Sequence, residues 1–418
     1  MSANAKRPGP RLDAMDAALW AVPVRSVQTR PHIGAVLHCE GTAPSLDEVK
    51  AELADRLPNC ASLRSRVNLR AKRWDPVSVD LEDHVAETVL APGPDAVDDA
   101  VRRLIHQPLP ANGPHWQLHV LHGHEPGRYA LLYRVHHALQ DGAGMLGALE
   151  SLFGEPDSSV SSAGYPFPQS PKVTFAETGR TVAALGYALR RKGIWAPAKV
   201  EFSSRRTLAW ADVPADALRT AGRRHGGTAN DAFLAALGHG LAEWAGGQYG
   251  PAIAAPPVTL LIPANVRREP DAPGNRIALA VAEVPGGRLT ADERLRAVAA
   301  STTGLKSPTR REALRRIAAA APAWLMIRVL AALRSPARTG ALASNLVLRS
   351  PLRFRGDPVT RVVPVMWTPE GVPLTALLIT YQGTTSVCFT TDAAIPGLDG
   401  IHERWRRTVE SWTAPART

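Results

Sequence analysis

The segment from Tyr129 to Gly144 carries the side chains in this sequence that are best suited to chemistry. If residues 129–137 form a strand, their side chains alternate between two faces, and His137 shares the apolar face with Val135 while His136 lies on the other. A histidine placed in an apolar interior loses the solvation of its charged form, so its imidazole stays neutral. A neutral imidazole is the form that a general base requires, and we therefore take His137 as the candidate base.

The residues that follow predict a short loop and the start of a helix. Asp141 can cap a helix that begins at Gly142, and apolar residues between Met145 and Phe153 give that helix a buried stripe. Gly142 and Gly144 leave the first turn bare, so a ligand or another backbone segment can approach closely. The alternative is purely structural: a buried His137 bonds a carbonyl group, and Asp141 only caps the helix.

Two other kinds of site are disfavoured. Adjacent histidines on a strand cannot both reach one metal ion, and no other group of His, Asp or Glu has ligand spacing, so we expect no metal. The sequence contains no Gly-x-Ser-x-Gly segment, which argues against a serine hydrolase. The three cysteines, Cys39, Cys60 and Cys388, show no paired spacing and indicate a reducing cytoplasm.

Length and composition set the scale on which these residues must be positioned. The 418 residues, 45% hydrophobic and 21% charged, suit two globular α/β domains and exclude a disordered chain or a disulfide-stapled miniprotein. The net charge of +11 is spread along the chain without aromatic interleaving or a zinc-finger pattern, so we expect no nucleic-acid partner. Anionic lipid, a carrier protein or a phosphate-bearing cofactor remain open as acidic partners.

Local patterns predict the order of the elements. A Ser- and Pro-rich stretch at 154–171 is the clearest linker, and an amphipathic helix is expected after it, at 175–191. We divide the chain into a disordered tail (1–10), an N-terminal domain (11–153), a linker with a bridging helix (154–199) and a C-terminal domain (200–418). Further helices are expected at 46–57, 95–106 and 229–245, the last capped by Thr228 and stopped by Gly246-Gly247, with hairpins at 116–135 and 372–391.

The sequence shows neither a secretory signal nor a long transmembrane stretch. The N-terminus lacks an apolar core segment, and the most apolar window, Ile317 to Leu333, is interrupted by Pro322 and Arg328. We therefore expect a cytoplasmic protein. The window fits a buried alanine-rich helix or a helix resting on a membrane surface, which leaves a peripheral membrane contact open.

The segment His136-His137-Ala-Leu-Gln-Asp141-Gly142 resembles the HHxxxDG motif of chloramphenicol acetyltransferase, peptide-synthetase condensation domains and bacterial wax ester synthase/diacylglycerol acyltransferases. The surrounding order resembles the last of these families along most of the chain, from about residue 12 to 400. The segments that carry this resemblance are Leu12–Asp16, Pro31–Gly34, Glu40-Gly41, Pro114–Trp116, Asn230–Leu237, Ile262–Arg267 and Gly274–Arg276.

The resemblance implies a pseudo-dimer of two chloramphenicol-acetyltransferase-like α/β domains with a tunnel between them. Acyl-CoA would enter as co-substrate from one side and a small-molecule alcohol from the other, without a permanently bound cofactor. His137 would take the proton of the acceptor hydroxyl and return it to the leaving thiolate. Asp141 would hold the loop through an ion pair with an arginine that the sequence does not identify.

Two further site candidates keep alternative roles. Asn230 would stabilise the oxyanion or brace its helix, and Trp116 would line a channel or belong to the core. Gly142 is expected to let a ligand or another backbone segment approach closely.

Departures from the family pattern place the acceptor, rather than the chemistry, in question. His115 stands where the family has leucine, and Ser344–Arg349 reads Ser-Asn-Leu-Val-Leu-Arg in place of Ser-Asn-Val-Pro-Gly-Pro. We expect a specialised acyltransferase, for example one that esterifies a secondary metabolite. Two alternatives remain: a condensation-type enzyme that uses a carrier-protein thioester and an amine or hydroxyl acceptor, and a non-catalytic lipid- or metabolite-binding homologue. The sequence does not predict the oligomeric state.

Overall fold

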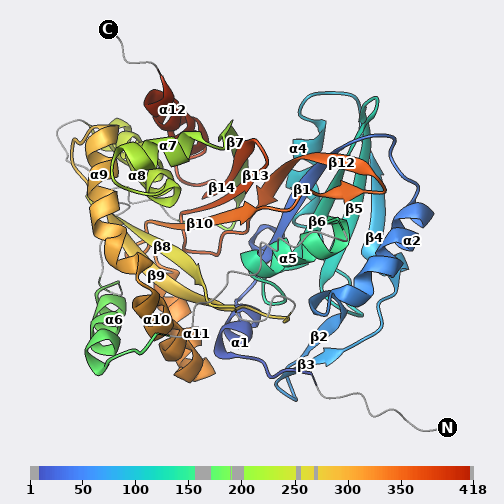
Figure 1. Cartoon of the computed structure of the whole chain (residues 1–418), viewed down its shortest axis with the longest axis horizontal. Helices are drawn as coiled ribbons and strands as arrows, with labels where there is room; N and C mark the ends of the chain where they lie inside the picture. Colours follow the sequence, from blue (N-terminus) through green and yellow to red (C-terminus); the bar gives the residue numbers. More distant parts are fainter. Residues whose placement is uncertain are drawn as a thin grey trace.

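The computed structural model describes residues 9–155, 171–188, 190, 202–250, 256–267 and 272–414. The predicted disordered tail therefore lies almost wholly outside the described residues, as do most of the linker at 156–170 and its end at 191–199. The described residues form two six-stranded sheets with helices packed around them, arranged as two lobes (Figure 1).

The first sheet has the strand order β11-β12-β1-β6-β5-β4. Its strands are β1 (His32–Glu40), β4 (Val85–Val89), β5 (Trp116–Glu125), β6 (Arg128–His136), β11 (Arg353–Phe354) and β12 (Asp357–Val365). The predicted hairpin at 116–135 is β5 and β6, which are antiparallel. Almost every residue of β6 is buried, because both faces of the strand are covered.

The second sheet has the order β7-β14-β13-β10-β8-β9. Its strands are β7 (Arg206–Pro214), β8 (Val258–Asn265), β9 (Ile277–Val284), β10 (Ala341–Leu348), β13 (Leu374–Tyr381) and β14 (Thr384–Asp392). The predicted hairpin at 372–391 is β13 and β14, and its turn falls at Gln382-Gly383 as expected. A small separate hairpin joins β2 (Ser65–Asn68) to β3 (Arg73–Pro76).

Four strands of each sheet repeat one arrangement. In the first sheet, β1, β6 and β5 are successively antiparallel, and β4 then pairs with β5 in parallel. In the second sheet, β7, β14 and β13 are successively antiparallel, and β10 then pairs with β13 in parallel. The two lobes are therefore similar α/β units, in agreement with the predicted fold class.

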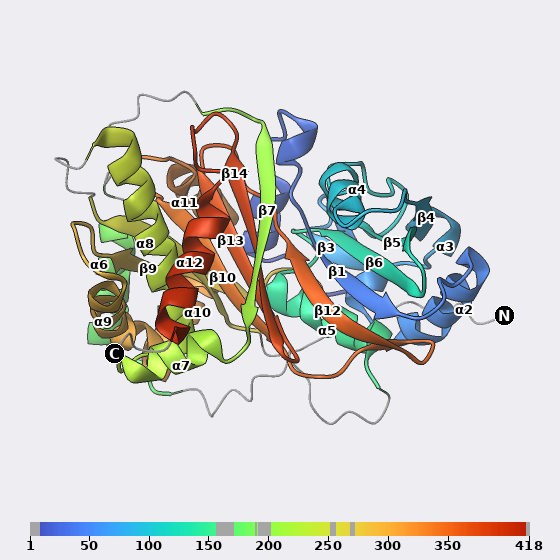
Figure 2. The same cartoon turned by 90° about the horizontal axis from the view of Figure 1, so that it is seen from above.

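Two strands from the C-terminal part of the chain, β11 and β12, belong to the N-terminal sheet. β12 pairs with β1 from Gly34↔Val365 to Cys39↔Val359, so it covers the edge that β1 would otherwise expose (Figure 2). A single apolar core also includes side chains of both lobes, among them Leu149 of the first and Ile379 of the second. The lobes are thus joined by backbone pairing as well as by packing.

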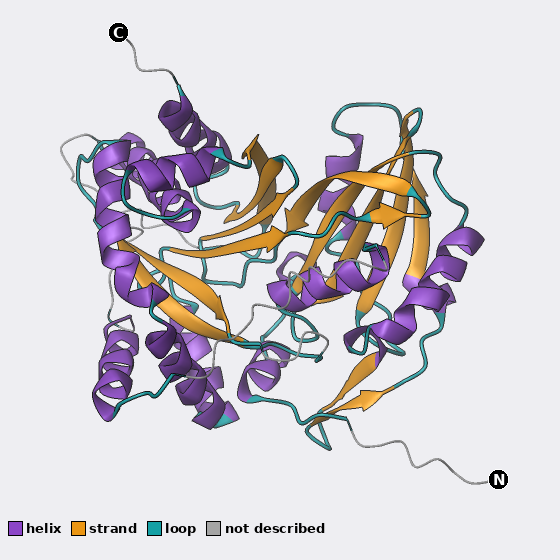
Figure 3. Ribbon diagram, in the orientation of Figure 1, coloured by secondary structure: helices purple, strands orange, loops and turns teal. Residues whose placement is uncertain are grey.

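The helices surround the two sheets (Figure 3). They are α1 (Ala14–Trp20), α2 (Leu46–Arg56), α3 (Leu81–His84), α4 (Ala96–Leu104), α5 (Gly142–Phe153), α6 (Phe175–Ala188), α7 (Ala217–Arg224), α8 (Ala229–Tyr249), α9 (Ala291–Thr302), α10 (Pro308–Ala320), α11 (Ala323–Leu333) and α12 (Ile401–Thr413). Short 3-10 turns lie at Val27–Thr29, Leu57–Asn59, Ser62–Arg64 and Thr303–Lys306.

Capping residues mark where several helices begin. The predicted capping boxes at Ser45 and Thr228 are both present. The predicted stop at Gly246-Gly247 is wrong, because α8 continues to Tyr249 and ends at Gly250, whose φ of 84° breaks the helix. Glycine lowers helix propensity without ending a helix whose other residues are well packed, and Trp244 and Ala245 just before the pair are buried.

The apolar window 317–333 is divided between two helices. Pro322 stands before α11, and α10 and α11 meet at an angle of 117°. Among the described residues, no single helix has the length and apolar character needed to cross a membrane, although this bent pair meets both criteria when taken together.

Candidate active site

His137 lies directly after β6, at the junction of the two lobes. The strand ends at His136, one residue earlier than predicted, and the backbone N–H of His137 donates to Pro31 O at 2.7 Å. Only 8% of His137 is exposed. The loop that follows pairs with Gly274 of the second lobe through Gln140, and α5 then begins at Gly142. The catalytic candidate is thus held by segments that come from both halves of the chain.

Asn275 determines which nitrogen of His137 carries a proton. The amide Nδ2 of Asn275 donates to His137 O at 2.7 Å and to Ala138 O at 3.1 Å, and these two carbonyl acceptors fix the orientation of the amide group. Its Oδ1 lies 3.0 Å from His137 Nδ1 and can only accept, so Nδ1 carries the hydrogen. The neutral ring then has its lone pair on Nε2, which is the atom available to remove a proton.

Burial also keeps this imidazole uncharged. Loss of solvation lowers the pKa of His137 below its usual value near 6.5, and the charge of Asp141 and the hydrogen bond to Asn275 oppose that shift only in part. The ring stands edge-on to Trp367, with the two ring centroids 6.1 Å apart. An uncharged imidazole with its lone pair on Nε2 is chemically a general base.

Asp141 has both of the roles that the sequence suggested. Its Oδ1 accepts from Gly144 N at 2.7 Å and caps α5, while its Oδ2 accepts from Arg267 Nη2 at 2.9 Å and from Arg276 N at 2.6 Å. The carboxylate and the guanidinium are each 1% exposed. Arg267 is therefore the arginine that the sequence could not identify, and the pair ties α5 to the loop between β8 and β9.

Asp16 in α1 holds the same loop from the other side. Its Oδ1 accepts from Asn275 N at 2.6 Å, and its Oδ2 accepts from Trp74 Nε1 at 3.2 Å. Burial, together with the nearby charge of Asp13, raises the pKa of Asp16 to about 7. A Cβ atom on Gly274 would lie 2.5 Å from Asp16, so only glycine lets the loop approach the carboxylate this closely.

His136 belongs to a separate aromatic cluster. Its ring centroid lies 4.7 Å from that of Trp20 and within about 6.2 Å of those of His32 and His115. Its Nδ1 accepts from Ala138 N at 3.1 Å, and burial lowers its pKa. The unusual His115 also packs edge-on against Trp20, at 5.0 Å. His136 therefore supports the turn that carries His137.

The remaining candidates differ in their surroundings. Trp116 is completely buried, donates from Nε1 to Leu63 O at 2.9 Å and stacks on His84, which favours its core interpretation. Asn230 is half-buried at the start of α8, where its Oδ1 accepts from Asn345 Nδ2 at 3.3 Å.

Gly142 is approached by a side chain of the second lobe. A Cβ on this glycine would lie 2.8 Å from Leu346 Cδ1. A side chain, rather than the ligand or backbone segment expected at Gly142, lies close to this glycine, and it belongs to Leu346 in the segment that departs from the family pattern.

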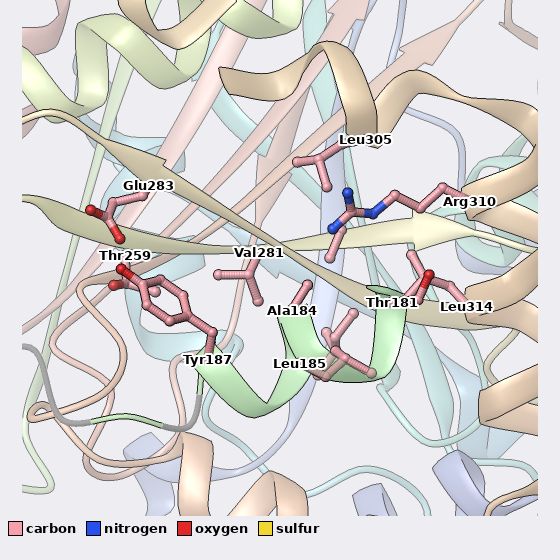
Figure 4. Close-up of a pocket in the computed structure, with 12 residues that line it drawn as sticks. Thr181, Ala184, Leu185, Tyr187, Thr259, Val281, Glu283, Leu305, Arg310 and Leu314 are labelled. Atoms are coloured by element: carbon pink, nitrogen blue, oxygen red, sulfur yellow. The ribbon is translucent and has the colours of Figure 1, made fainter. Parts of the chain in front are cut away.

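Two cavities lie near these elements. The larger, of about 790 Å³, opens between α1, the β2–β3 turn, the β8–β9 loop and the α10–α11 corner, and Asn275 is part of its wall. The smaller, of about 130 Å³, lies between α6, α10 and the β8–β9 strands and is lined by Tyr187, Leu185 and Arg310 among others (Figure 4). The smaller cavity shares no residue with the surroundings of His137. Within the described residues, no group of three or more His, Cys, Asp or Glu is arranged to hold a metal ion.

Three residues of this site had no assigned role in the sequence. Asn275 and Arg267 occur in segments that carried the family resemblance, and Asp16 occurs in another. Their roles depend on contacts with residues more than 120 positions away in the chain, as in the Asn275–His137 bond. The available signal was that these residues lie in segments matching the family pattern, Asn275 directly after Gly274, but nothing in the spacing indicates their partners.

Comparisons with known proteins agree with this geometry. Residues 12–191 match the family model described as the wax ester synthase/diacylglycerol acyltransferase catalytic domain, and residues 273–408 match the WS/DGAT C-terminal domain. A Mycobacterium tuberculosis protein named as a diacylglycerol O-acyltransferase is 29% identical over 228 residues, which are 50% of this chain and 50% of that protein. A second M. tuberculosis protein of the same name is 32% identical over 139 residues, or 31% of this chain and 29% of that protein. The chain thus matches about half the length, or less, of these relatives.

Solved structures extend the likeness to nearly the whole fold. The wax ester synthase/diacylglycerol acyltransferase of Marinobacter aquaeolei VT8 has a TM-score of 0.65 at 18% identity, covering 96% of this chain and 98% of that one. The starter condensation domain of rhizomide synthetase, in complex with C8-CoA, has a TM-score of 0.67 at 14% identity, covering 97% of this chain and 94% of that one. At these identities the likeness concerns the fold, and it confirms the predicted class.

Proposed function

The chain belongs to the wax ester synthase/diacylglycerol acyltransferase family, and we propose that it transfers an acyl group from a coenzyme A thioester to an alcohol, with His137 as the general base. The observation that carries this proposal is the hydrogen bond from His137 Nδ1 to Asn275 Oδ1, which leaves Nε2 unprotonated in a buried ring. The family supports the reaction class, and the geometry supports the role of the residue.

The reaction proceeds by direct attack. His137 Nε2 accepts the proton of the acceptor hydroxyl while the oxygen attacks the thioester carbonyl carbon, and a tetrahedral oxyanion forms. The C–S bond then breaks, the carbonyl reforms as an ester, and the proton on His137 passes to the departing thiolate to give free coenzyme A. No covalent acyl-enzyme is needed, and acyl-CoA is a co-substrate rather than a resident cofactor.

Asn230 remains the candidate for stabilising the oxyanion. Its Oδ1 is occupied by Asn345, so its Nδ2 is the group that would donate. The next residue after Asn345, Leu346, lies against Gly142 at the start of α5. The hydrogen-bonded pair of Asn230 and Asn345 therefore lies at the junction of the two lobes, where His137 is also found.

The setting of the reaction is also part of the proposal. We place it in the cytoplasm, with an acceptor that is a small-molecule alcohol. Trp324, Leu325 and Ile327 of α11 are exposed on an arginine-containing helix, which favours peripheral contact with a membrane that supplies or receives an apolar substrate.

The test is thiol release from a panel of acyl-CoAs, from acetyl to palmitoyl, with alcohol acceptors. His137→Ala is expected to lower turnover by roughly 10²–10⁴-fold, the usual contribution of a positioned base. His136→Ala should reduce turnover less, because His136 supports the turn through packing and its hydrogen bond from Ala138 N rather than by moving the proton. Full turnover by folded His137→Ala would refute the base assignment.

The same assay separates the alternatives. Turnover of an acyl group on a carrier protein, but not on coenzyme A, would indicate condensation-type chemistry. Ligand binding without thiol release across the acceptor panel would indicate a binding protein. Mass spectrometry of co-purified ligands would identify the acceptor class.

A further inference from the structure

The smaller cavity, between α6, α10 and strands β8 and β9, has no task in the proposed reaction. None of the side chains that line it contacts His137 or Asp141 (Figure 4). Tyr187, which is part of its wall, is 47% exposed, so the cavity can be reached from solvent on the side of α6. Its volume is about 130 Å³, and an apolar cavity of about 150 Å³ holds benzene. The smaller cavity therefore suits a molecule of about six to nine non-hydrogen atoms.

Most of the wall is apolar. On β9, Leu279 and Val281 point to the same face of the sheet, because side chains alternate along a strand. This face is covered by α6 and α10 rather than by solvent. Such a wall suits an aliphatic chain and offers no ligand to a metal ion. Its apolar members are Ala184, Leu185, Leu279, Ala280, Val281, Leu305 and Leu314.

Arg310 brings a positive charge to one end of this wall. Its side chain extends from the first turn of α10 over the apolar residues (Figure 4). Within the described ranges of the chain, Arg310 forms no ion pair, whereas Arg315 on the same helix pairs with Glu312 at 2.6 Å. A half-buried guanidinium without a counter-charge favours a carboxylate ligand, which it can hold by two parallel hydrogen bonds.

Thr259 supplies a hydrogen-bonding group at the other end of the cavity. It lies opposite Glu283 in the β8–β9 ladder, so the two side chains share one face, across the cavity from Arg310 (Figure 4). Only 5% of Thr259 is exposed, and its hydroxyl has no hydrogen-bond partner among the residues that the structure describes. Glu283 already interacts with another residue of the chain. Because a buried hydroxyl without a partner is costly, a polar ligand atom at Thr259 would be favoured.

We propose that this cavity is a second ligand site, which takes a short aliphatic carboxylate with a hydroxyl group at its other end. The carboxylate lies at Arg310, a chain of about four to six carbon atoms lies along the apolar wall, and the hydroxyl lies at Thr259. This inference goes beyond the proposed acyl transfer and does not depend on it.

A ligand in this cavity touches elements that also position the candidate active site. The strands β8 and β9 are joined by the loop that contains Arg267 and Asn275, and α10 also contributes Arg315 to the wall of the larger cavity. Binding to the folded chain alone stabilises it, so the ligand should raise the Tm in proportion to its occupancy.

The first experiment measures binding of 4-hydroxybutyrate and 6-hydroxyhexanoate by calorimetry, without acyl-CoA or acceptor. Arg310→Gln should raise the Kd of both probes about tenfold or more, because the charge-assisted hydrogen bonds to the carboxylate are lost. Arg311→Gln is the matched control, since Arg311 is the next residue of α10 but is exposed and lies outside the cavity wall. It should leave the Kd unchanged.

The second experiment tests the hydroxyl end. Thr259→Val keeps the shape of the side chain and removes its hydroxyl, so the Kd of 6-hydroxyhexanoate should rise about threefold or more. The Kd of hexanoate, which has no hydroxyl, should not change. The same variant should not lower the Tm of the free protein, because the Thr259 hydroxyl bonds to no other described residue.

The third experiment fills the cavity. Ala184→Phe places a ring among the apolar side chains and should raise the Kd of both probes about tenfold or more. Ala183→Phe adds the same ring on the exposed face of α6 and should have no effect on binding. Thermal unfolding of each variant shows whether it is folded, and Arg310→Gln tests the site without any change in packing.

The remaining outcomes decide between this site and the catalytic one. Both probes should bind equally well to His137→Ala and in the presence of saturating octanoyl-CoA, whatever the turnover of that variant. Displacement of the probes by octanoyl-CoA would place them in the catalytic site and overturn the inference. Unchanged affinity in Arg310→Gln, equal affinity for hexanoate and 1-hexanol, or no binding of either probe at millimolar concentration would also overturn it.

Discussion

At the scale of single residues, the proposed chemistry depends on the proton carried by His137. Asn275 acts as a positioning residue: its amide is held by two carbonyl groups, and its oxygen holds the ring. Asp16 in turn holds the backbone of Asn275. A base in the N-terminal half is therefore oriented by an amide from the C-terminal half.

The pH dependence of kcat/KM should reveal this arrangement. Burial lowers the pKa of His137 below that of an ordinary histidine, so activity should fall only at a pH below the usual titration range of histidine, where the ring becomes protonated. Asn275→Asp puts a negative charge beside the ring, which should move the acidic limb to higher pH. Asn275→Ala removes a bond that favours the protonated form, and should move the limb to lower pH.

Both Asn275 variants should lower kcat by about tenfold or more because the ring orientation is lost. The exposed Asn59 provides a matched control, since Asn59→Ala should change neither value. A fall in kcat with an unmoved acidic limb in both variants would mean that Asn275 has only a structural role.

Much of the residue-level site could be predicted. The alternation along β6 singled out His137, and the cap by Asp141 and its pairing with an arginine are confirmed. The choice of Arg267 as partner, and the roles of Asn275 and Asp16, could not be predicted, because each depends on how two distant segments meet. The cluster of His32, His115 and His136 around Trp20 was missed for the same reason.

At the scale of elements, the start of α5 and the β8–β9 loop are joined by the Asp141–Arg267 pair. Asp141→Ala should lower the free energy of unfolding by about 3–5 kcal/mol, because it leaves the buried guanidinium of Arg267 without its counter-charge. Chemical denaturation measures this loss. Asp141→Ala/Arg267→Met should recover part of it by removing the unpaired charge.

An exposed pair serves as the control for that measurement. Glu40 and Arg128 are both about half-exposed, so Glu40→Ala should cost less than about 1 kcal/mol. If Asp141→Ala cost no more than this control, the pair would not be what fastens the loop to α5.

The first sheet and its surroundings should also be sensitive to acid. Burial lowers the pKa of His32, His106 and His119 to about 4 and that of His38 to about 3. Between pH 4 and the usual value of 6.5, the unfolded chain therefore binds more protons than the folded one, and stability falls as the pH decreases. The raised pKa of Asp16 has the opposite effect on the unfolding free energy, because the folded chain then binds the extra proton, but this is one group against four histidines.

A variant can isolate one of these contributions. His119→Gln removes a titrating ring that is 4% exposed, and should make the decline in unfolding free energy between pH 6.5 and 4 shallower. His402→Gln, on the surface of α12, should leave the slope unchanged. An identical slope in wild type and His119→Gln would argue against the buried histidine as a source of acid sensitivity.

Element types were predicted better than element ends. Caps and hairpin turns depend on local residues, so the starts of α2 and α8 and the β13–β14 turn are confirmed. The end of α8 depends on tertiary packing, which kept Gly246 and Gly247 helical. The strand carrying His137 ends one residue early because Pro31, which accepts from His137 N, has no N–H to donate back to β6.

At the scale of the whole molecule, β12 makes the two lobes interdependent. Residues 11–153 alone would expose the edge of β1 and part of the shared core. We expect this fragment to aggregate or to show no cooperative unfolding by circular dichroism. Co-expression with residues 154–418 should restore a soluble complex, and a stably folded isolated fragment would contradict this view.

The division of the chain at 153 and 200 remains a prediction, but the exchange of β12 across it could not have been foreseen. The sequence of Asp357–Val365 fits an ordinary strand of either sheet. Strand pairing across more than three hundred residues is decided by the assembled core, which no local pattern encodes.

The crossing strand also sets an order of events during protein synthesis. At ribosomal rates of roughly 5–20 residues per second, β1 waits for tens of seconds before Val359–Val365 emerges to pair with it. Throughout that interval the edge of β1 in the nascent N-terminal sheet has no partner strand. The strand β1, which pairs with the strand that leads to His137, therefore gains its second neighbour only when translation is nearly complete.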